Sequence, residues 1–298
     1  MEQVGAGGSD SVTLRPRRRP LAARLWRLAR RQPVGAGSLV LVLLIVLVAV
    51  VGPAIAPYDL NVSDTRARLS GPSLTHPFGT DNLGRDILSR VIAGTRIAFL
   101  VSSASIALGV SLGALIGLVS GWFRGALDTL LQRLIDAMMA IPALVLAMAI
   151  VAVLGQGLDK LIIALAAFQV PTAARTVYGT VLSAREEVYV DAAIALGAPT
   201  SRVLVRHILP NILAPLLVIV SVQIGTVIVS EAALSFVGLG VQPPAVSWGS
   251  MLKDAQTYLE TGPWLIIFPT AAIGVTVLSL NFLGDTLRDI WDPKLRGR

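Results

Sequence analysis

Six long apolar blocks divide this chain, and they restrict its fold more than any other feature. They cover residues 32–58, 97–123, 137–158, 161–184, 207–230 and 261–284, and Arg175 is their only Asp, Glu, Lys or Arg. About 20 helical residues cross the hydrocarbon core of a bilayer, so each block is long enough to span it. Membrane-spanning strands would be shorter and would alternate in hydropathy. The pattern predicts an all-α integral membrane protein with six transmembrane helices.

The composition excludes an ordinary water-soluble domain. Charged residues make up 14% of the chain, against about 25% in typical soluble domains. The net charge of +7 is concentrated in residues 1–33, a basic arm expected in the cytoplasm near lipid headgroups rather than on nucleic acid. The chain has no Cys and only two His, so neither thiol chemistry nor a metal site is expected.

The first block admits two interpretations. The basic arm, the apolar residues 39–51 and the sequence Ala54-Ile55-Ala56 look like a secretory signal peptide with its cleavage site. The polar arm is unusually long for such a leader, however, and the apolar block is long enough to cross the membrane. A retained first transmembrane helix over residues 34–57 is therefore the favoured interpretation.

The basic residues between the blocks indicate which side of the membrane each connection occupies. Lys and Arg favour the segments that lie inside when both termini are cytoplasmic. This orientation makes residues 58–95 an extracytoplasmic segment and residues 286–298 a cytoplasmic tail. The core, residues 96–285, then holds five further helices and an inner connection at 184–211. Residues 236–261 are expected to form a partly inserted outer loop or a short helix.

The inner connection carries the most informative local pattern. Residues 191–196 favour a short helix, because Ala and Leu have high helix propensity. Gly197 can adopt the left-handed conformation that ends a helix, and Pro199 suits the first turn of the next one. Pro210 disfavours a simple continuation into the fifth span. The result is a compact helix–turn–helix whose small residues permit close approach by a partner; the alternative is an ordinary amphipathic connector.

The same segment resembles the cytoplasmic coupling loop of bacterial ABC importer permeases. The family pattern is Glu-Ala-Ala, three residues, Gly, nine residues, Ile, one residue and Leu-Pro. Here Asp191 takes the place of the Glu, Gly197 and Leu209-Pro210 match at the family spacing, and His207 replaces the Ile. The resemblance implies that the loop docks on an ATPase subunit. The residues that would make this contact are Asp191, Ala192, Ala193, Leu196, Gly197, Ala198, Pro199 and Thr200.

Further motifs are similar to the dipeptide and oligopeptide branch of that family, which includes nickel importers. They are residues 76–86 (HPFGTDNLGRD) with Ser89-Arg90, residues 242–244 with Trp248-Gly249, and residues 284–294. The resemblance runs from about residue 25 to 296 and is to the second, C-type permease of a heterodimeric pair. It implies the type I ABC importer permease fold in a bacterial cytoplasmic membrane.

The chain itself lacks an ATP-binding motif. A P-loop needs Gly-Lys followed by Ser or Thr, whereas the only lysines, Lys160, Lys253 and Lys294, follow Asp, Leu and Pro. No catalytic residue and no cofactor are therefore expected here, and the chain is not expected to be an enzyme. The resemblance implies a complex with a homologous second permease, two ATPase subunits that bind ATP and Mg, and an extracytoplasmic substrate-binding protein.

The predicted function is ATP-driven import of dipeptides or short oligopeptides. Nickel or another small solute is the alternative cargo for the same architecture. An autonomous channel or an ion-coupled secondary transporter is the alternative of another class. Disruption of residues 191–200 separates the two classes, because only an ATP-driven importer requires them. An intramembrane enzyme is disfavoured, since Asp, Glu and His are scarce inside the blocks.

Isolated polar residues and glycines leave several interpretations open. Glu231, after the fifth block, either lines the translocation pathway or is a paired structural group near the outer interface. Arg175 is expected to extend toward the cytoplasmic surface, and His76 to structure the outer loop. Gly113 and Gly117 are spaced for close packing between helices. Internal ion pairs or a receptor contact are the two interpretations of the outer charges, namely Asp81, Arg85 and Asp86.

Overall fold

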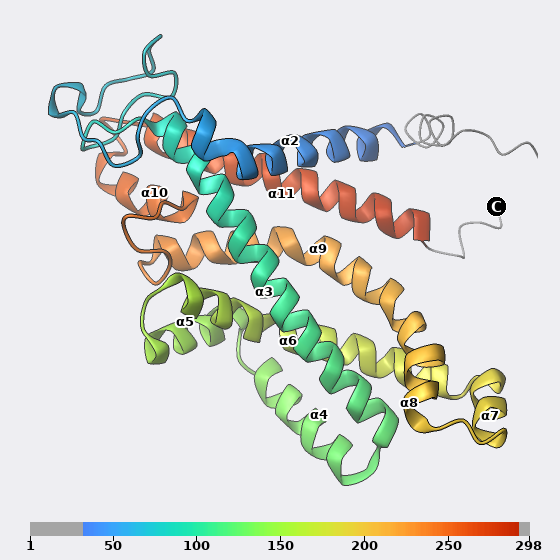
Figure 1. The fold of residues 1–298 in the computed structure, drawn as a ribbon. Coiled ribbons are helices and arrows are strands. Elements are labelled where there is room, and N and C mark those ends of the chain that lie inside the picture. Colours follow the sequence, from blue (N-terminus) through green and yellow to red (C-terminus); the bar gives the residue numbers. More distant parts are fainter. Residues whose placement is uncertain (1–31, 292–298) are drawn as a thin grey trace, which may run out of the picture.

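The computed structural model describes residues 32–291, and helices make up its regular structure (Figure 1). The α-helices are α2 (Pro33–Ile55), α3 (Ile87–Phe123), α4 (Gly125–Met139), α5 (Ala143–Leu154), α6 (Leu158–Arg185), α7 (Val188–Ala195), α8 (Thr200–Val203), α9 (Leu209–Phe236), α10 (Trp248–Ala255) and α11 (Trp264–Trp291). Within this described part there is no strand, only an isolated bridge between Thr80 and Asp86. Most of the predicted basic arm, residues 1–31, and the last residues of the predicted tail, 292–298, lie outside the described residues.

The described residues contain five helices that can each span a membrane, and six spans if one bent helix pair is counted as a span. Helices α2, α3, α6, α9 and α11 are long and apolar enough to cross a membrane, and the bent pair α4–α5, counted as one span, makes the sixth. Large apolar side chains face outward on them: Leu43 is 59% exposed, Val50 72% and Leu278 57%. Such a surface is unfavourable in water and suits the hydrocarbon core of a bilayer. The all-α membrane fold predicted from the blocks is confirmed.

The third block departs from the expected continuous helix over residues 137–158. Helix α4 ends at Met139, and α5 follows Pro142 at an angle of 95° to it. Pro142 has no N–H and restricts the residue before it, so the hydrogen-bond ladder of α4 does not continue through this point. With 12 residues, α5 rises by about 18 Å and is too short to cross alone. The expectation of one continuous helix is wrong, because the block is divided between two helices that form a broken span or a re-entrant loop.

Helices α3 and α6 form the most extensive contact between described helices. Gly109, Gly113 and Gly117 line the face of α3 that meets α6, and a Cβ at any of them would collide with the α6 backbone. Small residues at this spacing let two helix backbones approach closely, which favours association in lipid. The packing role predicted for Gly113 and Gly117 is confirmed.

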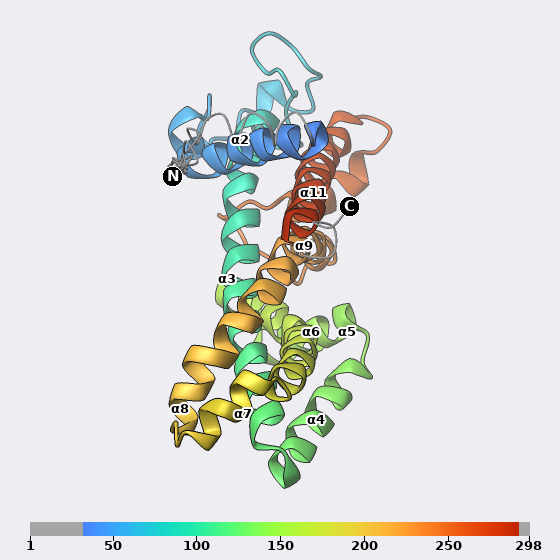
Figure 2. The ribbon, with the colours of Figure 1, turned by 90° about the vertical axis from the view of Figure 1, so that its right-hand side faces the viewer.

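The elements outside the spans lie at two opposite ends of the molecule (Figures 1 and 2). The segment between α2 and α3 lies with α10 at one end, and α7 and α8 lie at the other. Helix α10 is the short helix considered for residues 236–261. Helix α2 packs along α3 and α11, which favours a retained first span over a cleaved leader. The candidate functional residues are therefore divided between two faces.

Candidate functional site: the connector between α6 and α9

The connector between α6 and α9 (residues 186–208) contains a short helix that ends in a defined turn. Gly197, two residues after α7, has a φ of +78°. Its N–H donates to the Ile194 carbonyl at 2.9 Å, and the Ala198 N–H donates to the Ala193 carbonyl at 3.1 Å. These two bonds form a Schellman motif, which satisfies the last carbonyls of the helix. The turn predicted at Gly197 is confirmed.

One face of the connector is fixed to the ends of the spans. Val190 of α7 and Val203 of α8 are fully buried. They belong to an apolar cluster with side chains from α3, α6, α9 and the turn before α9, namely Ala114, Leu118, Trp122, Val177, Val181, Ala184, Ile208 and Ile212. A close-packed cluster resists deformation, so α7 and α8 are held firmly against the ends of three spans.

The other face of the connector is exposed and apolar. Val188 is 81% exposed and Leu196 88%, while Tyr189 and Ile194 are each a little under half exposed. Val188 and Tyr189 begin α7, Ile194 lies in its last turn, and Leu196 is its C-cap, so the exposed apolar side chains occur at both ends of this short helix. An exposed apolar surface of this kind marks an interaction site. We call these four residues the apolar tip.

The structure brings the predicted contact residues together on the connector. Ala193 and Ala198 are half-buried against the spans, and the others are exposed, namely Asp191, Ala192, Leu196, Gly197, Pro199 and Thr200. The prediction included only Leu196 of the apolar tip. Large apolar side chains next to Glu186-Glu187 in an inner connection are the sequence signal that identifies the other three.

The passage from the connector into α9 differs from expectation in two details. Pro199 is the N-cap of α8 rather than a residue of its first turn. Pro210 does not interrupt the chain of helical turns, because a π-helical turn, Leu204–Ile208, directly precedes α9. A wider turn of this type leaves room for the proline ring at the start of a helix, where its missing N–H is not needed.

His207, which replaces the Ile of the family pattern, packs within the connector. Its ring lies 5.9 Å from the ring of Tyr189. The Asn211 amide donates to the Tyr189 hydroxyl at 2.8 Å and to the His207 carbonyl at 2.6 Å. These contacts fix α7 to the first turn of α9, so the substitution keeps the connector attached to the fifth span.

Polar contacts join α3, α4 and α6 beside the connector. Arg185, the last residue of α6, donates to the Trp122 carbonyl at 2.6 Å, and its guanidinium lies 5.3 Å from the centre of the Trp122 ring. The Tyr178 hydroxyl donates to Asp128 of α4 at 3.2 Å. The end of α6 that leads into α7 is therefore held by two neighbouring helices.

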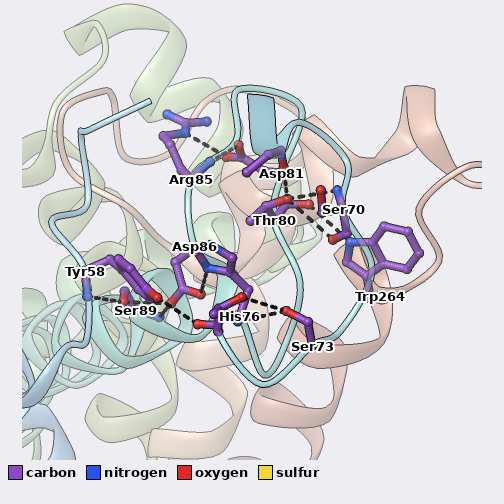
Figure 3. A network of polar contacts seen from close by, with 12 residues as sticks. Tyr58, Ser70, Ser73, His76, Thr80, Asp81, Arg85, Asp86, Ser89 and Trp264 are labelled. Atoms are coloured by element: carbon purple, nitrogen blue, oxygen red, sulfur yellow. Dashed lines mark hydrogen bonds and ion pairs between the residues drawn. The ribbon is translucent and has the colours of Figure 1, made fainter. Parts of the chain in front are cut away.

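At the opposite end, a polar network holds the segment between α2 and α3 (Figure 3). Asp86 caps α3 by accepting a hydrogen bond from the Ser89 N–H at 2.8 Å, and it also contacts Nδ1 of His76 at 2.9 Å. Asp81 accepts from the Arg85 backbone N–H and, at 2.7 Å, from the Arg85 guanidinium. Asp81 and Arg85 thus form one of the internal ion pairs considered for this segment, and His76 lies within the network that holds it.

Two charged residues of the spans make contacts within the chain. Arg175, expected to extend toward the surface, pairs with Asp136 of α4. Glu231 of α9 is 1% exposed and accepts a hydrogen bond from the Ser235 hydroxyl at 2.7 Å. Its second carboxyl oxygen has no partner among the described residues. This buried position favours the structural interpretation of Glu231 over exposure to a pathway.

Spans that end in a small connector with an exposed apolar tip define a polytopic membrane transport subunit as the class of protein. The chain belongs to the family of binding-protein-dependent transport system inner membrane components, whose model matches residues 113–297. Residues 21–72 match the N-terminal TM domain of oligopeptide transport permease C. The chain is thus an ABC importer permease subunit, as the resemblance implied.

Curated relatives and solved structures agree with this family. A protein of Brucella suis biovar 1 (strain 1330), assigned as a peptide transport system permease, is 43% identical over 277 residues, which are 93% of each chain. The glutathione transport system permease protein GsiD of Escherichia coli O157:H7 is 42% identical over 91% of this chain and 90% of its own. An inward-facing crystal form of the MetNI methionine ABC transporter is similar in fold, with a TM-score of 0.50 and 18% identity over 69% of this chain and 96% of that one.

Proposed function

We propose that this chain is the C-type permease of an ABC importer for dipeptides or short oligopeptides, and that α7 delivers the energy of ATP hydrolysis to the spans. The proposal rests on the difference between the two faces of the connector, one of which is buried and the other exposed. Val190 and Val203 are buried against the spans, whereas Val188 and Leu196 are almost fully exposed. One face is thus fixed to the membrane domain, and the other is free to dock on an ATPase subunit.

Closure of the docked ATPases on ATP displaces α7 as a rigid body in this mechanism. The cluster around Val190 joins α3, α6 and α9, so the displacement changes the positions of three spans together. Packed helices switch between discrete arrangements rather than deforming continuously. ATP binding and hydrolysis would in this way alternate the spans between outward-open and inward-open states.

Both termini of the chain are proposed to lie in the cytoplasm of a bacterium, with the spans in its cytoplasmic membrane. The distribution of Lys and Arg supports this orientation. It places the connector where ATP is available, and it places the network around Asp86 outside. A reporter fused after Arg298 is expected to give a cytoplasmic signal, and an external signal would contradict the orientation.

The proposed complex contains a homologous second permease, two ATPase subunits and an extracytoplasmic substrate-binding protein. ATP and Mg bind to the ATPase subunits, and the cargo passes between the two permeases. Contact with an ATPase is assigned to residues 191–193 and 196–200 together with the apolar tip. Glu231 is the weaker candidate for the pathway, because its side chain is buried. Uptake that survives Glu231→Gln would leave it only a structural role.

Peptide cargo is supported by the names of the relatives, which specify peptide and glutathione transport. Glutathione is itself a short peptide. Nickel or another small solute remains the alternative cargo. ATPase activity of the reconstituted complex is expected to rise with the binding protein and a peptide, and a rise with nickel alone would assign the metal instead.

The sharpest test of the coupling site replaces Leu196 with Asp. Leu196 is 88% exposed, so the change leaves the packing of the spans intact but puts a charge on the docking face. ATPase binding and uptake into proteoliposomes are expected to fall at least about tenfold, because a charge buried in an apolar contact is strongly unfavourable. Leu74→Asp is the matched control, since Leu74 is fully exposed and belongs to the segment between α2 and α3, which lies at the opposite end of the molecule (Figure 1). Equal uptake by both variants would reject the assignment.

A further inference from the structure

A cavity of about 260 Å³ opens at the end of the molecule opposite the connector. Its walls come from the start of α3, from the segment between α9 and α10, and from α10 itself. Three basic side chains line it, Arg85, Arg90 and Lys253, together with the acidic Asp254. Basic groups therefore outnumber acidic ones on its surface.

Arg90 is the unusual member of this group. It is 5% exposed, and its nearest charged partner is Asp81, with 3.7 Å between Nε of Arg90 and Oδ2 of Asp81. No side chain or carbonyl within the described residues accepts a hydrogen bond from its guanidinium. A guanidinium carries five N–H donors, and the nitrogens of Arg90 are not among the fully enclosed side-chain atoms without a partner, so they keep contact with the cavity. Arg90 therefore presents unused donors to the cavity that it lines.

The other two basic groups add positive charge that the chain itself does not neutralise fully. Lys253 is exposed and has no ion pair with any described residue. Arg85 binds Asp81 through Nε (Figure 3), and no described residue accepts a hydrogen bond from its terminal nitrogens. Asp81 is shared by Arg85 and Arg90, so with Asp254 two carboxylates face three cations. One positive charge and several N–H donors remain for an external anion.

We propose that this cavity receives a carboxylate side chain of the extracytoplasmic substrate-binding protein when that protein docks. An arginine guanidinium can bind a carboxylate through two parallel hydrogen bonds, and Lys253 adds a positive charge at the rim of the cavity. The proposal deepens the proposed function and rests on it, since the orientation assigned there puts the cavity on the outer face.

Size and place favour a protein side chain over the cargo as the source of the carboxylate. Sites that enclose small molecules usually measure about 300–1,000 Å³, so 260 Å³ does not hold an oligopeptide. A liquid water occupies about 30 Å³, which leaves room for one Asp or Glu side chain with waters. The cavity also lies at the ends of α3 and α9 and against α10, not along the length of the spans.

The affinity of the binding protein for the whole complex in nanodiscs tests the proposal. Arg90→Gln is expected to weaken binding by about tenfold or more, because it removes the arginine that would pair with the inserted carboxylate of the binding protein. Lys253→Gln, on the exposed rim, is expected to weaken it by about 2- to 10-fold and to reduce its salt dependence. The matched control is Arg68→Gln, an exposed arginine of the same outer segment that does not line the cavity.

Zero-length crosslinking identifies the carboxylate directly. A carbodiimide activates a carboxylate, and a lysine amine in contact with it forms an amide with release of the urea. Mass spectrometry is expected to find Lys253 joined to an Asp or Glu of the binding protein. Lys160, which pairs with Asp159 away from the cavity, is the internal control, and Lys253→Arg should remove the crosslink while keeping the affinity.

The results of these experiments distinguish a failure of the cavity proposal from a failure of the importer assignment. If the binding protein does not stimulate ATP hydrolysis by the wild-type complex, the importer assignment itself fails. If stimulation is normal but Lys253→Gln binds like Arg68→Gln, only the cavity proposal is overturned, and this holds even if Arg90→Gln does not fold. A Lys253 crosslink to the cargo peptide, without loss of binding-protein affinity, also overturns it.

Discussion

Replacing Gly197 with valine tests whether the geometry of the connector controls coupling. Gly197 has a φ of +78°, and an added Cβ there meets no atom within 4 Å. The substitution therefore acts through the backbone conformation and not through crowding. The left-handed region costs an L-residue about 1–2 kcal/mol, and β-branched side chains tolerate it worst.

A penalty of 1–2 kcal/mol lowers the equilibrium constant for forming the Schellman turn by roughly 5- to 30-fold. If docking requires this turn and the turn is only marginally stable, ATP-driven uptake falls by up to this factor. Membrane insertion persists, because the cluster around Val190 does not include Gly197. Gly197→Asn is the matched control, since Asn tolerates the left-handed region, and its uptake is expected to fall less than about threefold.

The assay is the initial rate of uptake into proteoliposomes per mole of assembled complex, with ATPase binding measured in parallel. The valine variant should lose both, and the asparagine variant should keep most of both. Wild-type uptake by the valine variant would refute the reasoning. So would equal losses in the two variants, because these would point to side-chain size rather than to backbone conformation.

Three further predictions concern the membrane domain. Gly113→Leu is expected to destabilise the purified protein by about 1–3 kcal/mol through overpacking against α6, whereas Gly274→Leu, at an open position, is expected to change its thermal midpoint little. Asp86→Ala removes the cap of α3 and should cost about 0.5–2 kcal/mol in the same unfolding assay; an unchanged midpoint would contradict the capping role. Arg175→Ala should cost less than about 1 kcal/mol, because the ion pair is roughly half exposed, and a larger loss would show that this pair is shielded from solvent.

The spans were predictable because crossing a bilayer imposes a local requirement. About 20 apolar residues must follow one another, and no distant contact is needed to recognise them. The turn at Gly197 is equally local, since a glycine after an Ala-rich helix indicates a left-handed end. The same holds for the capping of α3 by Asp86, three residues before Ser89.

The break in the third span was not predictable from its proline alone. Pro171, Pro215 and Pro269 all lie inside continuous helices of this chain, whereas Pro142 ends up between two helices at 95°. Neighbouring helices in a membrane can satisfy the backbone groups that a proline frees. Whether they do so depends on tertiary packing, which the local sequence does not reveal.

The cavity around Arg90 also depends on distant contacts. Lys253 lies more than 160 positions from Arg90 in the chain, and the two meet only because α10 packs beside the start of α3. The outer motif that contains Arg85 was recognisable from the sequence, and its internal ion pairs were predicted. The unused donors of Arg90 became visible only in three dimensions.

Concentrative uptake measures most directly whether this subunit depends on partner ATPases for its energy. Proteoliposomes that contain both permeases and both ATPases, with binding protein outside and ATP inside, are expected to accumulate peptide above its external concentration. Vesicles with the two permeases alone are expected to accumulate none, and the full complex with Leu196→Asp is expected to take up at least about tenfold less than the wild type. Uphill transport by the permeases without ATPase subunits would contradict the account.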